Sequence, residues 1–273
     1  MKTWRVIDTG YLGCHLNMAI DEALLEAYDS AEEKVPVLRI YGWVPQAFSI
    51  GYFQNPDDEL DLDRCRIEGI DFVRRITGGG VIFHKSELTY SIVCREQDLS
   101  ARTFYKETYR FLCSFIVEAY KSLGLEAEYA LQETARQSKS WFCFANRERY
   151  DILINGKKIG GNAQRRKKGM IFQHGSIPLK SDLNKALLLL RDSSAIDKAN
   201  ITSLSDALGQ DISYNRLRDL LIKSFKQTFN VDIAREGLSK REEALSGHLL
   251  EEKYKREEWN LYRNASSPKA RVA

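Results

Sequence analysis

The sequence predicts an α+β fold in which a mixed or antiparallel sheet is flanked by helices. Two observations favour this class. Short turns join strand-like segments, and helical segments stand between them. A third observation argues against a dinucleotide-binding fold. The chain has no run of βαβ units, and its glycines do not follow the GxGxxG spacing.

The first half of the chain is expected to alternate strands with two amphipathic helices. Strands are predicted at residues 4–7, 37–41, 47–52 and 88–93. Apolar residues at helical spacing predict a first helix through Leu16, Ala19, Ile20, Ala23, Leu24 and Ala27, with Asp21, Glu22 and Glu26 on its polar side. A long helix over 103–123 has inward-facing Phe104, Thr108, Phe111, Leu112, Phe115 and Ala119.

The second half begins with a hairpin and then becomes helical. Asn155-Gly156 joins residues 150–154 to 157–159, and Asn-Gly between β-prone runs is the strongest short-range hairpin signal. A further strand is predicted at 170–174, and helices at 183–190, 214–229 and 239–254. No linker or repeat divides the chain. We therefore expect one domain over residues 1–263, with a core at 1–182, a helical part at 183–263 packed on it, and a disordered tail at 264–273.

Composition narrows the class of protein. The chain has 273 residues, of which 43% are hydrophobic and 29% charged, as in a soluble globular protein, and its net charge of +3 is too small to indicate a nucleic-acid partner. Five scattered cysteines, without a CxxC pair or a metal-ligand cluster, indicate neither disulfides nor a metal. The amino terminus lacks a signal-peptide pattern, and the longest purely apolar run is 186–190. We expect a cytoplasmic protein with no membrane segment.

The segment from Arg74 to His84, RRITGGGVIFH, is the most informative in the chain. Three glycines stand between two β-prone runs, which predicts a hairpin-like turn stripped of side chains. Glycine adopts positive φ without strain, and a ligand can lie against its bare backbone N–H groups. Arg74 and Arg75 add positive charge and fork-shaped donors. The segment suits a carboxylate, a thioester carbonyl or a phosphate; the alternative is an ordinary turn with solvated arginines.

Lys158 and Cys143 are further candidates, each with a plainer alternative. Lys158 precedes Gly160-Gly161 and can approach a ligand carbonyl or phosphate, although a solvent-facing strand lysine is the simpler interpretation. Cys143 lies among aromatic residues, and between Lys139 and Met170 nine Lys or Arg residues outnumber two acids. Nearby cations lower a thiol's pKa, as a nucleophile requires. The alternative is a buried cysteine that acts as a small hydrophobe.

Two histidines end apolar strands. His84 and His174 can each act as a base or an orienting donor, although a lone histidine is more often structural. The chain contains no GxSxG signature of a serine nucleophile.

Taken together, these segments resemble the lipoate–biotin protein ligase superfamily and, within it, the octanoyltransferases of lipoate synthesis. The matching stretches are WRVIDTG (4–10), NMAIDEA (17–23), LRIYGW (38–43), SIGYFQ (49–54), RRITGG (74–79), VIFH (81–84), ELTYS (87–91), GKKIGGNAQ (156–164) and HGS (174–176). The resemblance covers residues 1–182 in order and continues weakly at 201–204 and 258–260.

The resemblance implies the fold of the biotin and lipoate ligase catalytic domain and an elongated acyl pocket lined by the RRxTGG loop. It implies that Lys158 binds the acyl carbonyl or an acyl-adenylate. In the cysteine-dependent octanoyltransferases the acyl group passes through a cysteine, and Cys143 stands in the corresponding place. The implied catalytic residues are thus Cys143 and Lys158, with no metal. The implied acyl- or substrate-binding residues are Arg74, Arg75, Thr77, Gly78, Gly79, Gly80, His84, Gly161, Asn162, Ala163, His174 and Gly175.

The resemblance also implies partners and leaves a choice of reaction. The donor would be octanoyl-acyl carrier protein or the octanoylated glycine-cleavage H protein, the acceptor a lipoyl-accepting domain, and no cofactor is needed. The first alternative is an ATP- and magnesium-dependent lipoate–protein ligase with an incidental Cys143. A module that binds a lipoyl domain without chemistry is the second. The chain departs from the octanoyltransferase pattern at Lys85, where the family has aspartate, and at 145–147, where it has Asp-Ala-Pro.

Overall fold

The computed structural model describes residues 2–99, 105–130, 150–194 and 196–264. Within this part, the main sheet has six strands in the order β10-β11-β6-β2-β1-β12. Their bounds are Gly161–Lys167 (β10), Met170–Pro178 (β11), Glu87–Arg95 (β6), Val37–Trp43 (β2), Thr3–Leu12 (β1) and Asp232–Arg235 (β12). The pairs from β10 to β2 are antiparallel, whereas β1 pairs in parallel with β2 and β12. The expected mixed sheet is confirmed.

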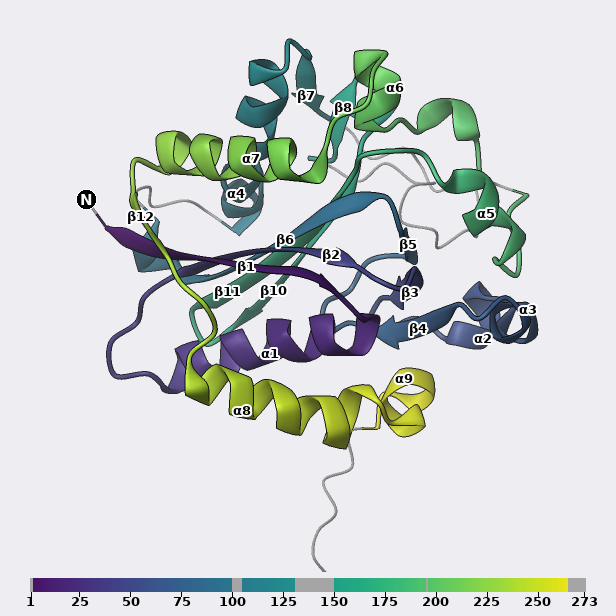
Figure 1. Cartoon of the computed structure of the whole chain (residues 1–273), viewed down its shortest axis with the longest axis horizontal. Helices are drawn as coiled ribbons and strands as arrows, with labels where there is room; N and C mark the ends of the chain where they lie inside the picture. The colour runs from purple at the N-terminus through teal and green to yellow at the C-terminus, as the bar shows by residue number, and fades with distance from the viewer. Residues whose placement is uncertain (1, 100–104, 131–149, 195, 265–273) are drawn as a thin grey trace, which may run out of the picture.

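Helices cover both faces of this sheet (Figure 1). On one face lie α1 (Cys14–Ser30) and α8 (Lys240–Leu249), which continues as a π-helical turn over Leu250–Tyr254. On the other lie α4 (Tyr105–Ser122) and α7 (Tyr214–Phe229), packed around Trp4, Tyr90 and Phe115. Ser213 caps the start of α7, and Asn230 ends it in the left-handed conformation. The predicted helix over 214–229 is confirmed residue for residue.

A small second sheet corrects the predicted glycine hairpin. The two arms of the glycine-rich loop are β4 (Asp71–Arg74) and β5 (Ile82–His84), but they do not pair with each other. Both pair with β3 (Ala47–Ile50), which lies between them, parallel to β4 and antiparallel to β5. The glycine-rich loop therefore crosses over β3 instead of turning tightly back.

The Asn155-Gly156 hairpin is present as predicted. It joins β8 (Ile152–Ile154) to β9 (Lys157–Lys158), and β7 (Ala127–Tyr129) completes a third sheet. Three strands that were not predicted are β7, β10 and β12. The strand β1 is longer than expected because it continues past Thr9-Gly10 through a register shift.

The remaining helices are short. They are α2 (Pro56–Glu59), α3 (Leu62–Ile67), α5 (Leu183–Leu188), α6 (Leu204–Leu208) and α9 (Glu257–Tyr262). Among the described residues, no helix combines the length and the hydropathy needed to cross a membrane. The tail predicted to be disordered lies outside the described residues from 265 onward.

Candidate active site

A narrow cavity lies between the glycine-rich loop (residues 74–84), α1, β2 and the β10–β11 hairpin. The lining residues that the sequence did not single out are Met18, Tyr41, Trp43, Ser49, Ile82, Thr89 and Ser176. The lining residues that were predicted are Arg75, Gly79, His84, Gly161, Asn162, Ala163, His174 and Gly175. The fold thus brings three motifs, separate in the sequence, to one cavity with aromatic and apolar walls and a few buried polar groups, as is typical of small-molecule sites.

One wall of this cavity is a series of buried hydrogen bonds. Arg75 Nη1 donates to the Ser49 hydroxyl at 2.7 Å, and that hydroxyl lies 2.6 Å from His84 Nε2. His84 Nδ1 lies 2.5 Å from Glu87 Oε1, and Glu87 Oε2 accepts from Ser176 Oγ at 2.7 Å. Because a guanidinium only donates and a carboxylate only accepts, the series is satisfied when His84 carries its proton on Nδ1. It links the glycine-rich loop to β11.

A second buried network connects α1 to the main sheet. Asp21 is only 2% exposed and accepts hydrogen bonds from Arg39 Nη1 at 2.7 Å, Tyr41 Oη at 2.8 Å and Ser91 Oγ at 2.8 Å. Burial by itself raises the pKa of the Asp21 carboxyl, but the Arg39 guanidinium, His174 and Ser91 together hold that pKa below its usual range. Asp21 is therefore a buried carboxylate with a complete set of donors.

His174 joins this network to the glycine-rich loop. Burial lowers the pKa of His174, although the Asp21 carboxylate 3.6 Å from Nδ1 opposes the shift. A neutral ring with its proton toward Asp21 leaves Nε2 as an acceptor, and Thr77 Oγ1 lies 2.7 Å from it. Thr77 does not line the cavity, but this contact positions the loop against β11.

Arg74 is not part of the cavity lining, in contrast to the prediction. Within the described residues its guanidinium donates to six backbone carbonyls, those of Gly51, Tyr52, Gln54, Trp259, Asn260 and Leu261. Burial lowers the pKa of Arg74 to about 10. Arg75 likewise donates to the carbonyls of Gly78 and Gly80. The two arginines therefore hold the loop, and only Arg75 reaches the cavity.

Two glycines allow the loop to close over β3. Gly79 has φ +94°, a backbone conformation that other residues rarely adopt. A Cβ atom at Gly51 would lie 2.0 Å from the Gly79 carbonyl oxygen, so no side chain fits there. Gly78 and Gly80 shape the same loop but do not line the cavity.

Lys158 is buried on β9 with a carboxylate partner. Its Nζ lies 2.7 Å from Asp151 Oδ2, and the side chain is 2% exposed. The Asn155-Gly156 turn pairs Leu153 with Lys158, which makes Asp151 the diagonal neighbour on the same face. A solvent-facing lysine, the simpler interpretation, is therefore wrong. The hairpin leads directly into β10, whose first residues line the cavity.

Cys143 lies outside the described residues. The described cysteines Cys14, Cys65, Cys94 and Cys113 are all buried and free. Burial raises the pKa of Cys65 to about 11 and those of Cys14 and Cys113 to about 12, and it raises the Cys94 pKa further. None of these four thiols is poised to be a thiolate near neutral pH.

The fold forms one group of possible metal ligands that the sequence spacing did not indicate. Among the described residues, the ligand atoms of Cys14, His15 and Asp71 lie within 4.8 Å of one another. None of the three lines the cavity. The candidate active site itself remains without a metal-ligand set in the part of the chain that is described.

Several site residues were missed from the sequence, although signals existed for some. The predicted polar position of Asp21 is wrong, because Asn17, Asp21, Leu24 and Tyr28 recur at helical spacing and are all buried. Glu87 also escaped notice. It alternates with Thr89 and Ser91 along β6, and such period-two polarity marks one face of a strand. Ser49 lies in the matching stretch SIGYFQ, but nothing in the sequence indicated its role at the cavity.

Comparisons with known proteins identify the family. The family model described as the lipoyl protein ligase A/B catalytic domain matches residues 14–226. The chain is 36% identical to the octanoyltransferase LipM of Clostridioides difficile over 273 residues (96% of this chain, 100% of the relative). It is also 36% identical to that of Bacillus subtilis over 277 residues (96% and 99%).

Solved structures of ligases share the fold. A lipoate-protein ligase A bound with ATP superposes with a TM-score of 0.78 at 28% identity, covering 96% of this chain and 99% of that one. A bipartite lipoate protein ligase from Thermoplasma acidophilum gives 0.78 at 27%, covering 96% of each. The fold expected from the resemblance is confirmed. The chain belongs to the lipoyl protein ligase A/B catalytic domain family.

Proposed function

We propose that this chain is an octanoyltransferase that moves an octanoyl group from a carrier-protein thioester, through a cysteine acyl-enzyme, to the lysine of a lipoyl-accepting domain. Full-length relatives named octanoyltransferase support the reaction class. The structural observation that carries the proposal is the narrow cavity walled by Met18, Tyr41, Trp43 and Ile82 and adjoining the Lys158 hairpin. Such walls suit an unbranched acyl chain, and the polar groups at β10 and β11 suit its carbonyl.

Cys143 is the proposed nucleophile. Its thiolate attacks the thioester carbonyl carbon, the carbon–sulfur bond to the carrier breaks, and the carrier leaves as a thiolate. The neutral lysine ε-amine of the acceptor then attacks the octanoyl-cysteine, forms the amide and loses a proton, and Cys143 is released as a thiolate. The support is the position of Cys143 before the Lys158 hairpin and the burial of the four described cysteines.

Lys158 is the proposed electrostatic catalyst. Its ammonium, held by Asp151 in a buried position, would stabilise the negative charge that develops on the carbonyl oxygen in both steps. We assign acyl contact to the predicted residues that line the cavity, and loop support to Arg74, Thr77, Gly78 and Gly80. Lys158 is thus assigned to stabilisation of the oxyanion, and the cavity lining to binding of the acyl chain.

The reaction needs no ATP, because the acyl group arrives as a thioester, stays a thioester on the enzyme and ends as a more stable amide. The proposed donor is octanoyl-acyl carrier protein or the octanoylated glycine-cleavage H protein, and the proposed acceptor is a lipoyl-accepting domain. Relatives of the same fold include a ligase solved with its E2 lipoyl domain, which supports such an acceptor. Free cysteines support a reducing cytoplasm as the location.

We infer that residues 1–263 act as one catalytic unit. The support comes from the C-terminal part, which contributes β12 to the main sheet and packs α8 on α1. It also binds the Arg74 guanidinium through the carbonyls of α9. A separately folding accessory domain would not share these elements.

An ATP-dependent lipoate–protein ligase is the second candidate, and the ATP-bound ligase of the same fold favours it. The test supplies octanoyl-carrier protein and a lipoyl-accepting domain without ATP, and in parallel free lipoate with ATP and magnesium. We expect octanoyl transfer in the first mixture. Transfer only in the second would establish the ligase instead, and transfer in neither would leave a binding module.

A further inference from the structure

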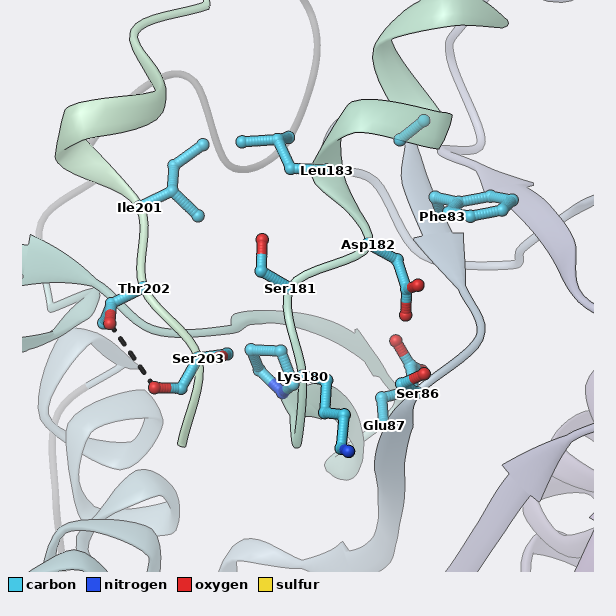
Figure 2. Close-up of a pocket in the computed structure, with 12 residues that line it drawn as sticks. Phe83, Ser86, Glu87, Lys180, Ser181, Asp182, Leu183, Ile201, Thr202 and Ser203 are labelled. Atoms are coloured by element: carbon cyan, nitrogen blue, oxygen red, sulfur yellow. Dashed lines mark hydrogen bonds between the residues drawn. The ribbon is translucent and has the colours of Figure 1, made fainter. Parts of the chain in front are cut away.

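A second cleft adjoins the acyl cavity. Glu87 lines this cleft, while its hydrogen-bond partners His84 and Ser176 line the acyl cavity, so the two spaces share a wall. Figure 2 shows three segments around it, residues 83–87, 180–183 and 201–203. The cleft is therefore a space distinct from the acyl cavity, yet separated from it by one layer of side chains.

Residues that line the cleft also contact the Lys158 hairpin. The amide of Thr202 donates to the carbonyl of Lys158 at 3.0 Å, and Ile201 forms a parallel bridge with Lys158. Ile201 and Thr202 both line the cleft, and Figure 2 places them across from Ser181 and Leu183. The strand that carries Lys158 therefore contacts residues that line the cleft. The same strand leads, through Gly161, to the acyl cavity.

The charges in this cleft are balanced within the protein. Asp182 Oδ1 accepts from Lys85 Nζ at 2.6 Å, and Lys180 Nζ donates to Asp211 at 2.5 Å. Glu87 is 4% exposed and accepts from His84 and Ser176. A nucleotide phosphate would meet the Glu87 and Asp182 carboxylates, which repel it. Asp182 Oδ1 and both Glu87 carboxylate oxygens already have donors within the protein.

The cleft contains polar groups that can form hydrogen bonds to a neutral ligand. The Oδ2 atom of Asp182 is buried and accepts no hydrogen bond within the described structure. A buried acceptor without a partner calls for a donor. The hydroxyls of Ser86, Ser181 and Thr202 line the same space beside apolar Phe83 and Leu183. An N–H donor next to carbonyl acceptors, on an otherwise apolar chain, complements this lining.

We propose that this cleft binds the pantetheine arm of the thioester donor, the uncharged, amide-bearing chain on the sulfur side of the scissile bond. This inference rests on the proposed function. A thioester carbonyl near Lys158 has two substituents that leave it in different directions. The acyl chain enters the cavity beyond Gly161, and the pantetheine arm lies along Ile201 and Thr202 with its distal amide N–H directed at Asp182.

The test measures acylation of the full chain by intact-mass kinetics with two small donors. S-octanoyl-pantetheine carries the whole arm, whereas S-octanoyl-N-acetylcysteamine lacks its distal amide. Ser181→Trp narrows the cleft at an exposed rim position, so the fold should tolerate it. Leu188→Trp is the matched control, since Leu188 is 58% exposed at the end of α5, the helix that follows Ser181, and does not line the cleft. Thr202→Val is a milder second variant that removes one hydroxyl.

We expect Ser181→Trp to lower kcat/KM for acylation by octanoyl-pantetheine about tenfold, the equivalent of one or two lost hydrogen bonds. Acylation by the truncated donor should hardly change, and Leu188→Trp should match wild type with both. Thr202→Val should also lower kcat/KM for octanoyl-pantetheine and not for the truncated donor, but by a smaller factor.

Three results would overturn the inference. Equal losses with both donors in both variants would indicate a structural effect, and no loss in either would show that the arm lies elsewhere. If the variants slow only the transfer from the acyl-enzyme to the acceptor domain, the cleft binds the acceptor lysine instead. If the wild-type chain is acylated by neither donor nor by octanoyl-carrier protein, the proposed function itself fails.

Discussion

The glycine-rich loop and the Lys158 hairpin both contribute to the candidate active site, but they are held in place differently. Arg74 fixes the loop through carbonyls in α9, as far as 187 positions away in the sequence. Lys158 is held by Asp151 of the same hairpin. The Arg74 guanidinium therefore depends on partners far away in the sequence, whereas the Lys158 ammonium is paired within its own hairpin.

The two regions also satisfy their buried charges in different ways. The guanidinium groups of Arg74 and Arg75 are surrounded by carbonyl oxygens, while the Lys158 ammonium faces a carboxylate. Because the arginine contacts join distant segments, their loss should weaken folding. The loss of Lys158 should first weaken catalysis. The predictions below test this division.

The largest effect is expected at the hairpin. Lys158→Ala should lower octanoyl transfer about 10³-fold, since it removes the charge proposed to stabilise the oxyanion. Lys157→Ala, at the exposed neighbour on the same strand, is the control and should transfer at the wild-type rate. Steady-state transfer assays compare the two, and a Lys158→Ala enzyme with wild-type kcat would remove the hairpin from the mechanism.

The next effect is expected at Arg74. Arg74→Met should lower the free energy of unfolding by about 4 kcal/mol, because several buried carbonyls lose a charged donor at once. Arg66→Met serves as the control, since Arg66 is exposed and forms a surface ion pair with Asp63. Urea denaturation followed by tryptophan fluorescence gives both values. A stability loss at Arg74→Met no larger than that at Arg66→Met would show that the Arg74 contacts do not support folding.

A smaller loss is expected in the network beneath the cavity. Asp21→Asn should cost about 3 kcal/mol of unfolding free energy, since it leaves the buried Arg39 guanidinium without its carboxylate. The same denaturation experiment measures it. Unchanged stability would mean that Asn17 and Thr9, which also accept from Arg39, are sufficient partners.

The smallest effect concerns pH. The folded-state pKa of His174 is lowered by burial, so the neutral ring contributes stability that is present above the ordinary histidine pKa of about 6.5 and is lost as pH falls through the folded value. The His15 pKa is lowered as well, mainly by burial. Unfolding measured between neutral and mildly acid pH should therefore show a shallower decline in His174→Gln than in wild type. An identical slope would mean that His174 is not the titrating group.

The sequence predicted elements whose signals are local. The helix over Tyr214–Phe229 has its own caps, and Asn155-Gly156 specifies its turn, so both were found. The strands β10 and β12 were missed because β10 reads as a cationic polar segment and β12 is a short edge strand. Only pairing with β11 and β1 makes them strands.

The candidate site was predicted where motifs touch the cavity and missed where the network is assembled by the fold. Arg75, His84 and His174 line the cavity as expected. Arg74 looked equivalent to Arg75 in the sequence, but the Arg74 side chain contacts α9 whereas the Arg75 side chain contacts Ser49 at the cavity. Asp21 and Ser49 acquire their roles only through partners from other elements.

In the proposed mechanism the octanoyl group passes through Cys143 without ATP. Intact-mass analysis of the chain after mixing with octanoyl-carrier protein tests it most directly. We predict one thioester-linked octanoyl group that is removed by hydroxylamine and absent in Cys143→Ala, while Cys14→Ala is acylated like wild type. An unmodified wild-type chain that transfers lipoate only with ATP and magnesium would contradict the claim.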